Sequence, residues 1–144
     1  MSETFQKKSE ELKKSFSKFP SPEDRYKALI EMGRNLPPFP AESKCPENLV
    51  AGCQSSLYLT SRFIDGLVFF EAASDALISA GLAAILIAVY NGESPETLLK
   101  QPPQFLSDLN IFASLSPNRS NGLAQIHLRM KKDALKFLVS TNQS

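Results

Sequence analysis

The stretch LYLTSRFIDGLVFF, residues 57–70, decides the fold. Leu57-Tyr58-Leu59-Thr60 and Leu67-Val68-Phe69-Phe70 have the apolar, aromatic and β-branched composition of strands. Asp65-Gly66 between them is a hairpin turn signal, because a two-residue hairpin turn favours residues that accept a positive φ. The sequence therefore predicts an antiparallel hairpin, with Asn48-Leu49-Val50 as a candidate short third strand.

Helix signals lie on both sides of the hairpin. Residues 1–19 place their apolar side chains on one helical face, and the apolar run from Ala76 to Tyr90, after Ser74-Asp75, is typical of a buried helix. Three further helices are expected at Ser-Pro pairs, which supply an N-cap and a first helical residue: Ser21-Pro22, Ser94-Pro95 and Ser116-Pro117. The predicted core stripe of the last helix is Leu123, Ile126, Met130, Ala134, Phe137 and Leu138. This order predicts an α+β fold of two layers, a small antiparallel sheet of about three strands packed with helices.

Composition limits the classes of function. The chain has 144 residues, of which 42% are hydrophobic and 22% charged, with a net charge of +1. We expect one globular domain spanning residues 1–144. A near-neutral chain gives no electrostatic reason to expect nucleic acid or an anionic membrane as a partner.

The sequence shows neither a secretory signal nor a membrane span. Residues 1–19 are lysine-rich and lack the apolar centre of a signal peptide. Residues 76–90 are shorter than the about 20 apolar residues that cross a bilayer. We therefore expect a cytoplasmic protein in which both cysteines are reduced, so that any role for them is chemical rather than architectural.

Cys53 is the strongest candidate for chemistry. It follows Gly52, which permits a tight turn, and precedes Gln54 and Ser55 in a small, polar loop between strand signals. A cysteine that serves only as a small hydrophobe more often lies in an apolar run. Spacing alone leaves both interpretations open.

The other thiol and the single histidine are weaker candidates. Cys45, between Lys44 and Pro46, is most simply an incidental loop thiol. His127 makes a Cys–His pair arithmetically possible, but its place beside an apolar stripe favours a packed or surface helix histidine. The spacing of the two cysteines fits no short zinc motif, so no metal site is expected.

Arg119 lies in the polar, turn-rich stretch Ser116-Pro117-Asn118-Arg119-Ser120-Asn121-Gly122, directly before an apolar helix. A planar guanidinium there is suited to brace a neighbouring loop or to meet a carboxylate of a partner. The simpler alternative is a solvated arginine.

These blocks together resemble the SufE family of sulfur-acceptor proteins. Gly52-Cys53-Gln54-Ser55 with the strand after it is similar to the family signature, and 31–37, 74–90 and 115–123 resemble three further blocks in the family's order. Tyr58 stands where the family commonly has tryptophan, and Cys45 where no cysteine is expected.

The resemblance implies a SufE/IscU-like fold and a role in sulfur transfer. Such proteins accept sulfane sulfur from a pyridoxal-phosphate cysteine desulfurase of the SufS type, stimulate it, and pass the sulfur to an iron–sulfur scaffold such as SufBCD. Carried onto this sequence, the acceptor is Cys53, Arg119 matches the family arginine, and Gly52, Gln54 and Ser55 are supporting or partner-binding residues. The protein would be a monomer or weak homodimer.

We expect no resident cofactor beyond a transient persulfide on Cys53, and no turnover by the chain alone, because no phosphate-binding glycine loop precedes a helix and the length leaves no room for a pyridoxal-phosphate domain. Two alternatives stay open. The chain could be a desulfurase-activating module in which Cys53 is dispensable, or an IscU-like cluster scaffold, although a scaffold needs about three or four ligands.

Overall fold

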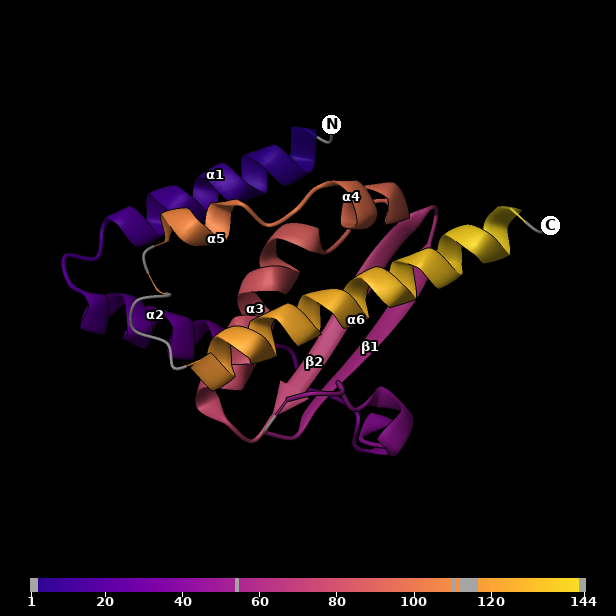
Figure 1. Ribbon diagram of the computed structural model, residues 1–144, viewed down its shortest axis with the longest axis horizontal. Helices are drawn as coiled ribbons and strands as arrows, with labels where there is room; N and C mark the ends of the chain where they lie inside the picture. Colours follow the sequence, from indigo (N-terminus) through magenta and orange to yellow (C-terminus); the bar gives the residue numbers. More distant parts are fainter. Residues whose placement is uncertain (1–2, 54, 110, 112–116, 143–144) are drawn as a thin grey trace.

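The computed structural model describes residues 3–53, 55–109, 111 and 117–142, with the side chains of 117–120 and 141–142 excepted (Figure 1). The elements in chain order are α1 (Glu3–Ser17), α2 (Pro22–Arg34), the 3-10 turns η1 (Ala41–Ser43) and η2 (Pro46–Asn48), β1 (Leu57–Ile64), β2 (Leu67–Ser74), α3 (Leu77–Tyr90), α4 (Pro95–Lys100), α5 (Phe105–Asp108) and α6 (Pro117–Asn142). The predicted α+β class is confirmed, and α5 is an element that the sequence analysis did not anticipate.

The hairpin forms as predicted and is longer than expected. β1 and β2 pair antiparallel from Leu57 opposite Ser74 to Ile64 opposite Leu67. Asp65 and Gly66 form the turn, with φ of 52° and 81°. Two positive φ values in succession are typical of a tight turn that matches the twist of the flanking strands.

The candidate third strand reduces to a single bridge. Leu49 pairs with Tyr58 outside the named strands, and the Val50 N–H donates to the Leu57 carbonyl at 2.9 Å. Pro46 has no N–H to give to a ladder and instead begins η2. The Leu49 carbonyl accepts a hydrogen bond from the Arg129 side chain, which leaves it out of a regular ladder. The sheet of the described residues therefore has two strands, not three.

One face of the hairpin carries the core. Because side chains alternate along a strand, the buried residues fall on a single face: Leu57, Leu59, Val68, Phe70 and Ala72. α3 contacts β2, α6 contacts β1, and the two helices contact each other, so one helical layer covers this face (Figure 1). The opposite face is partly covered where Phe39 lies against Tyr58, with ring centroids 6.4 Å apart.

α3 is the central helix. It is apolar nearly all round, and α2 packs against it. It begins at Leu77, slightly later than the Ser74-Asp75 signal indicates, and the Ser74 hydroxyl accepts from the Ala76 N–H at 3.1 Å. Within the described part of the chain, no helix is both long and apolar enough to cross a membrane.

α6 is a long helix that runs diagonally across the molecule in front of the hairpin (Figure 1). Four members of its predicted stripe are fully buried and two are half-buried. The buried four are Leu123, Ile126, Met130 and Ala134. The N-terminal end of this helix is what meets the Cys53 loop.

Candidate functional site

Cys53 lies in the loop between η2 and β1, directly after Gly52. Gly52 has φ of 84°, a left-handed conformation that side chains rarely adopt, so this turn favours glycine. The Cys53 side chain is half-buried and packs against the edge of the core. It is a free thiol. The turn thus places the sulfur between the core and the surface.

The beginning of α6 holds this loop. The Cys53 thiol donates a long hydrogen bond, 3.9 Å, to the Gly122 carbonyl. The Asn121 side-chain amide donates to the Gly52 carbonyl at 3.4 Å. The fold therefore brings together two segments that are 69 residues apart and that the sequence analysis selected separately.

Burial raises the pKa of the Cys53 thiol above its ordinary value. The charged thiolate is disfavoured because desolvation penalises it. The isolated protein therefore holds Cys53 as a neutral thiol, which is a weak nucleophile. Activation has to come from opening of the loop or from a group that a partner brings.

The structure describes the other predicted site residues to different extents. Gly52 is exposed and Ser55 half-buried. Gln54 lies outside the described residues, and so does the side chain of Arg119. The backbone of Arg119 lies in the first turn of α6, two positions before Asn121. The contact of the polar stretch with the Cys53 loop is made, among the described side chains and backbone, by Asn121 and Gly122.

Arg129 is a structural residue of the site region that sequence reasoning missed. Its guanidinium donates to the carbonyls of Glu47 at 2.8 Å and Leu49 at 3.0 Å. It also pairs with Asp133 at 3.3 Å, and Asp133 accepts from the Ser61 hydroxyl. The i,i+4 spacing of Arg129 and Asp133 predicts their pairing. Nothing in the local sequence predicts the hydrogen bonds from Arg129 to the distant loop.

Cys45 is the N-cap residue of η2 and has its own contacts. Its thiol donates to a Glu47 carboxylate oxygen at 3.3 Å, and the Asn48 amide donates to the sulfur at 3.4 Å. The hydrogen bond to Glu47 is the main cause of a raised pKa for Cys45. In the described residues neither a disulfide nor a hydrogen bond joins Cys45 to Cys53.

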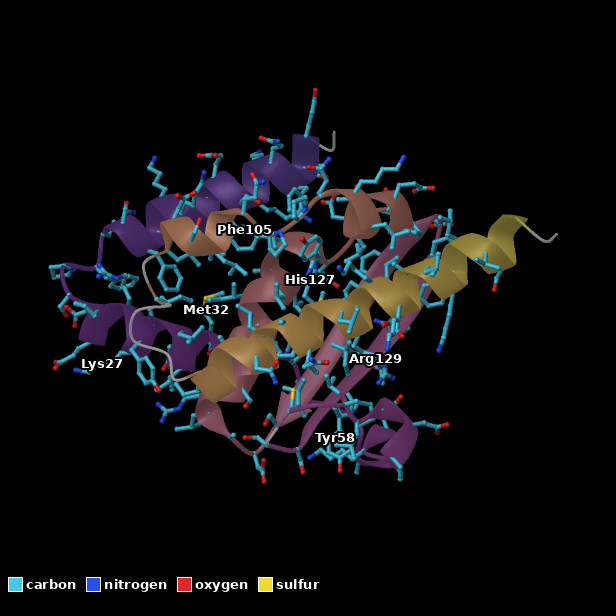
Figure 2. The ribbon with its side chains drawn as sticks, viewed as in Figure 1. Lys27, Met32, Tyr58, Phe105, His127 and Arg129 are labelled. Carbon is cyan, nitrogen blue, oxygen red and sulfur yellow. The ribbon has the colours of Figure 1, made fainter. Side chains whose placement is uncertain are left out.

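His127 is a packed helix histidine. Its ring stacks on Tyr90 with centroids 5.4 Å apart, and its Nε2 atom is buried without a hydrogen-bond partner in the described structure. Burial, with a smaller effect of the Lys131 charge, lowers its pKa to about 4. His127 and Arg129 point to different sides of α6 (Figure 2), and Arg129 is the one beside η2. No group of three metal-binding side chains lies together in the described ranges.

The fold and the loop thiol define a class of small α+β proteins that present a half-buried cysteine on a loop before a β-hairpin, and comparison gives the family. The profile of the SufE family, "Fe-S metabolism associated domain", matches residues 10–134. The chain belongs to the SufE family. The resemblance seen in the sequence is confirmed, and it assigns the chain a role in sulfur transfer linked to iron–sulfur metabolism.

Relatives support the same assignment. The chain is 35% identical over 122 residues to an uncharacterised SufE-like protein of Synechocystis sp., covering 85% of this chain and 77% of that protein. It is 35% identical over 133 residues to the chloroplastic/mitochondrial SufE-like protein 1 of Arabidopsis thaliana, covering 92% of this chain and 36% of that protein. The solution structure of a hypothetical protein from Thermus thermophilus matches with a TM-score of 0.76 at 26% identity, covering 92% of this chain and 96% of that one.

Proposed function

We propose that this chain is a persulfide acceptor and carrier. It takes sulfane sulfur onto Cys53 from a SufS-type cysteine desulfurase, stimulates that enzyme, and passes the sulfur to an iron–sulfur scaffold of the SufBCD kind. One observation carries the proposal: Cys53 is a free, half-buried thiol on a glycine turn, and among the described residues its sulfur donates one long hydrogen bond, to the Gly122 carbonyl. This arrangement shelters the sulfur and leaves it releasable.

The transfer is a displacement at sulfur, of the same kind as thiol–disulfide exchange. The Cys53 thiolate forms a bond to the outer sulfur of the donor's persulfide while the donor's S–S bond breaks. The electron pair of that bond leaves with the donor's thiolate, and the proton from Cys53 goes to solvent or to that thiolate. There is no net oxidation or reduction, and the chain needs no metal or organic cofactor of its own.

Such a carrier must shelter its sulfur when it is free and expose the sulfur when it is docked on a partner. A persulfide on Cys53 would be open to reductants, and the burial that raises the pKa of this thiol also restricts their access. Docking would then open the loop and expose the sulfur. We place Gly52 at the hinge of this opening and assign Gln54 and Ser55 a supporting or partner-binding role.

Arg119 is proposed as a brace of the same loop. It lies in the turn of α6 that also provides Asn121, and Asn121 reaches the Gly52 carbonyl. A guanidinium in this position is suited to bind backbone carbonyls or a carboxylate. The alternative within this proposal is that Arg119 meets the desulfurase directly.

Intact-mass measurement tests the proposal. After incubation with a SufS-type desulfurase and cysteine, the chain should gain one sulfur, and peptide mapping should place it on Cys53. The nearly isosteric Cys53→Ser should fold, lose the adduct and lose acceptor activity, while Cys45→Ser, the matched control, should keep both. An adduct on Cys45 alone contradicts the assignment. Full desulfurase stimulation by Cys53→Ser would instead favour the activating module.

A second experiment separates the carrier from an enzyme or scaffold. The purified chain should be colourless and release no sulfide from cysteine without the desulfurase. Anaerobic reconstitution with iron and sulfide should give no stable visible absorbance. A chromophore in either preparation would overturn this part of the proposal.

A further inference from the structure

Basic charge is concentrated on α6. The sequence of this helix contains five basic side chains, Arg119, Arg129, Lys131, Lys132 and Lys136, and one acidic side chain, Asp133. The whole chain has 16 basic and 15 acidic residues, so the remainder is net acidic. Asp133 is already bound to Arg129 and Ser61. Within the described residues Lys131, Lys132 and Lys136 form no ion pair, so the helix presents positive charge.

The outer face of α6 is also apolar. Leu128, Leu135 and Val139 are 40%, 48% and 44% exposed. Their spacing of seven and four residues aligns them along one side of the helix, with Lys132 and Lys136 beside them. Single exposed apolar residues are ordinary on a protein surface, but an aligned row beside unpaired lysines is typical of a contact surface. Neither lysine forms an ion pair within the described structure.

A hollow connects this face to the sulfur site. It has a volume of about 280 Å³ and lies between the loop that contains Glu47 and Ala51 and the α6 residues Leu128, Lys132 and Lys136. Gln125 also lines it, and the Gln125 side chain lies against Gly52. Ala51 is two residues before Cys53. A segment seated in the hollow would therefore lie next to the loop that carries the sulfur.

We propose that this hollow, together with the row Leu128, Leu135 and Val139, docks an acidic and partly apolar segment of the sulfur donor. The α6 docking face, as we call it, rests on the proposed function for the identity of that donor. Arg129 and Asp133, which pair with each other, also line the hollow, and so does Glu47. Charge complementarity still selects the occupant, because Lys132 and Lys136 together outweigh the Glu47 carboxylate and attract carboxylates. A second copy of this chain is a poorer occupant, since a symmetric contact through this face would place lysines against lysines.

The test is a matched pair of double charge reversals. Lys132→Glu/Lys136→Glu changes the docking face, and Lys7→Glu/Lys14→Glu makes the same change of net charge on exposed positions of α1. α1 lies along the edge of the molecule opposite to η2 and the Cys53 loop (Figure 1). Binding to a pyridoxal-phosphate-loaded SufS-type desulfurase is measured by calorimetry at several salt concentrations.

The docking-face variant should bind the desulfurase about tenfold more weakly and with a smaller salt dependence, while the α1 control should change by less than about twofold. The transfer rate at saturating desulfurase and the alkylation of Cys53 by iodoacetamide should stay close to the original values. Leu128→Ser/Leu135→Ser should also weaken binding but leave the salt dependence as it was, because it removes apolar contact only.

Three results would overturn the docking face: unchanged binding of the Lys132→Glu/Lys136→Glu variant, equal weakening in the α1 control, or intact desulfurase binding with impaired sulfur delivery to a SufBCD-type scaffold. The last result would mean that the α6 docking face binds the scaffold and not the desulfurase. If the unaltered chain binds the desulfurase through this face yet takes no sulfur onto Cys53, the proposed function fails and the docking face stands. Failure of the proposed function and of the docking face are thus separable.

Discussion

The Arg129 guanidinium of α6 donates a hydrogen bond of 2.8 Å to the backbone carbonyl of Glu47 in η2, 82 residues earlier in the chain. A second bond reaches the Leu49 carbonyl, and Asp133 holds the guanidinium from the other side. The Arg129 side chain therefore fixes to α6 the segment that leads into the Cys53 loop. The mobility of the Cys53 loop should therefore depend on these hydrogen bonds of Arg129.

Replacing this side chain should loosen the loop. Arg129→Ala removes both bonds to the carbonyls and the ion pair with Asp133, which keeps only its hydrogen bond from Ser61 among those described. The change should lower the free energy of unfolding by about 1–2 kcal/mol. Cys53 should be alkylated several times faster, because the loop opens more often. Urea unfolding and iodoacetamide kinetics, in a Cys45→Ser background, measure the two effects.

Arg129→Lys is the informative control. A single ammonium keeps the charge but lacks the planar fork of donors, so it should restore only part of the protection. If Arg129→Ala unfolds normally and Cys53 reacts at the original rate, the bonds to Glu47 and Leu49 do not position the loop.

The left-handed conformation of Gly52 gives a second prediction. Gly52→Ala and Gly66→Ala both place a side chain at a φ above 80°, and each should cost about 1 kcal/mol of stability. Only at position 52 would the added Cβ meet another group, Gln125 at 3.0 Å, whereas nothing lies within 4 Å at position 66. Gly52→Ala alone should therefore change Cys53 alkylation and sulfur acceptance.

Gly66→Ala is the matched control for backbone strain. Chemical denaturation gives the stability of each variant, and intact mass after reaction with the desulfurase and cysteine gives sulfur acceptance. Equal sulfur acceptance in the two variants would show that the turn at position 52 has no special role in the chemistry.

Features with a local cause were predictable from the sequence. The Asp65-Gly66 turn follows from two residues that accept positive φ, and the start of α2 follows from Ser21, whose hydroxyl accepts from the Asp24 N–H at 3.1 Å. The prediction of a third strand was wrong because a distant part of the chain decides the structure there: the Leu49 carbonyl accepts a hydrogen bond from a side chain of α6.

The candidate site also contains residues that the local sequence could predict and residues that it could not. Cys53 stood out because its loop composition is unusual for a structural cysteine. The sequence suggested only that Arg119 could brace a neighbouring loop; the contact of its polar stretch with the Cys53 loop is made by Asn121 and Gly122. Arg129 could not be selected, since its partners are backbone carbonyls, which every residue offers equally. Bracing by Arg119 stays a prediction.

The protonation of Cys53 gives a third prediction. Burial raises the pKa of this thiol, so the folded protein binds its proton more tightly than the unfolded chain does. In a Cys45→Ser background, the pH midpoint of iodoacetamide alkylation should lie above that of a free cysteine peptide measured alongside. When urea unfolds the protein, the pH midpoint of alkylation should fall to the value of the peptide. A folded-state midpoint at or below the peptide's would mean that the isolated protein already activates its thiol.

His127 gives the last prediction, a loss of stability in acid. Burial lowers its pKa to about 4, whereas in the unfolded chain it takes up a proton near the ordinary 6.5. Between these values the unfolded state binds the extra proton, so the free energy of unfolding falls as the pH drops from about 6.5 towards 4. Because the ring is partly exposed, we expect this contribution to be on the order of 1–2 kcal/mol. His127→Phe keeps an aromatic ring against Tyr90 and cannot be protonated. Urea unfolding at pH 7 and pH 4.5 should therefore show a smaller acid loss in the variant, since every other titrating group is shared. Equal losses in the two proteins would mean that His127 is as easily protonated in the folded state as in the unfolded chain.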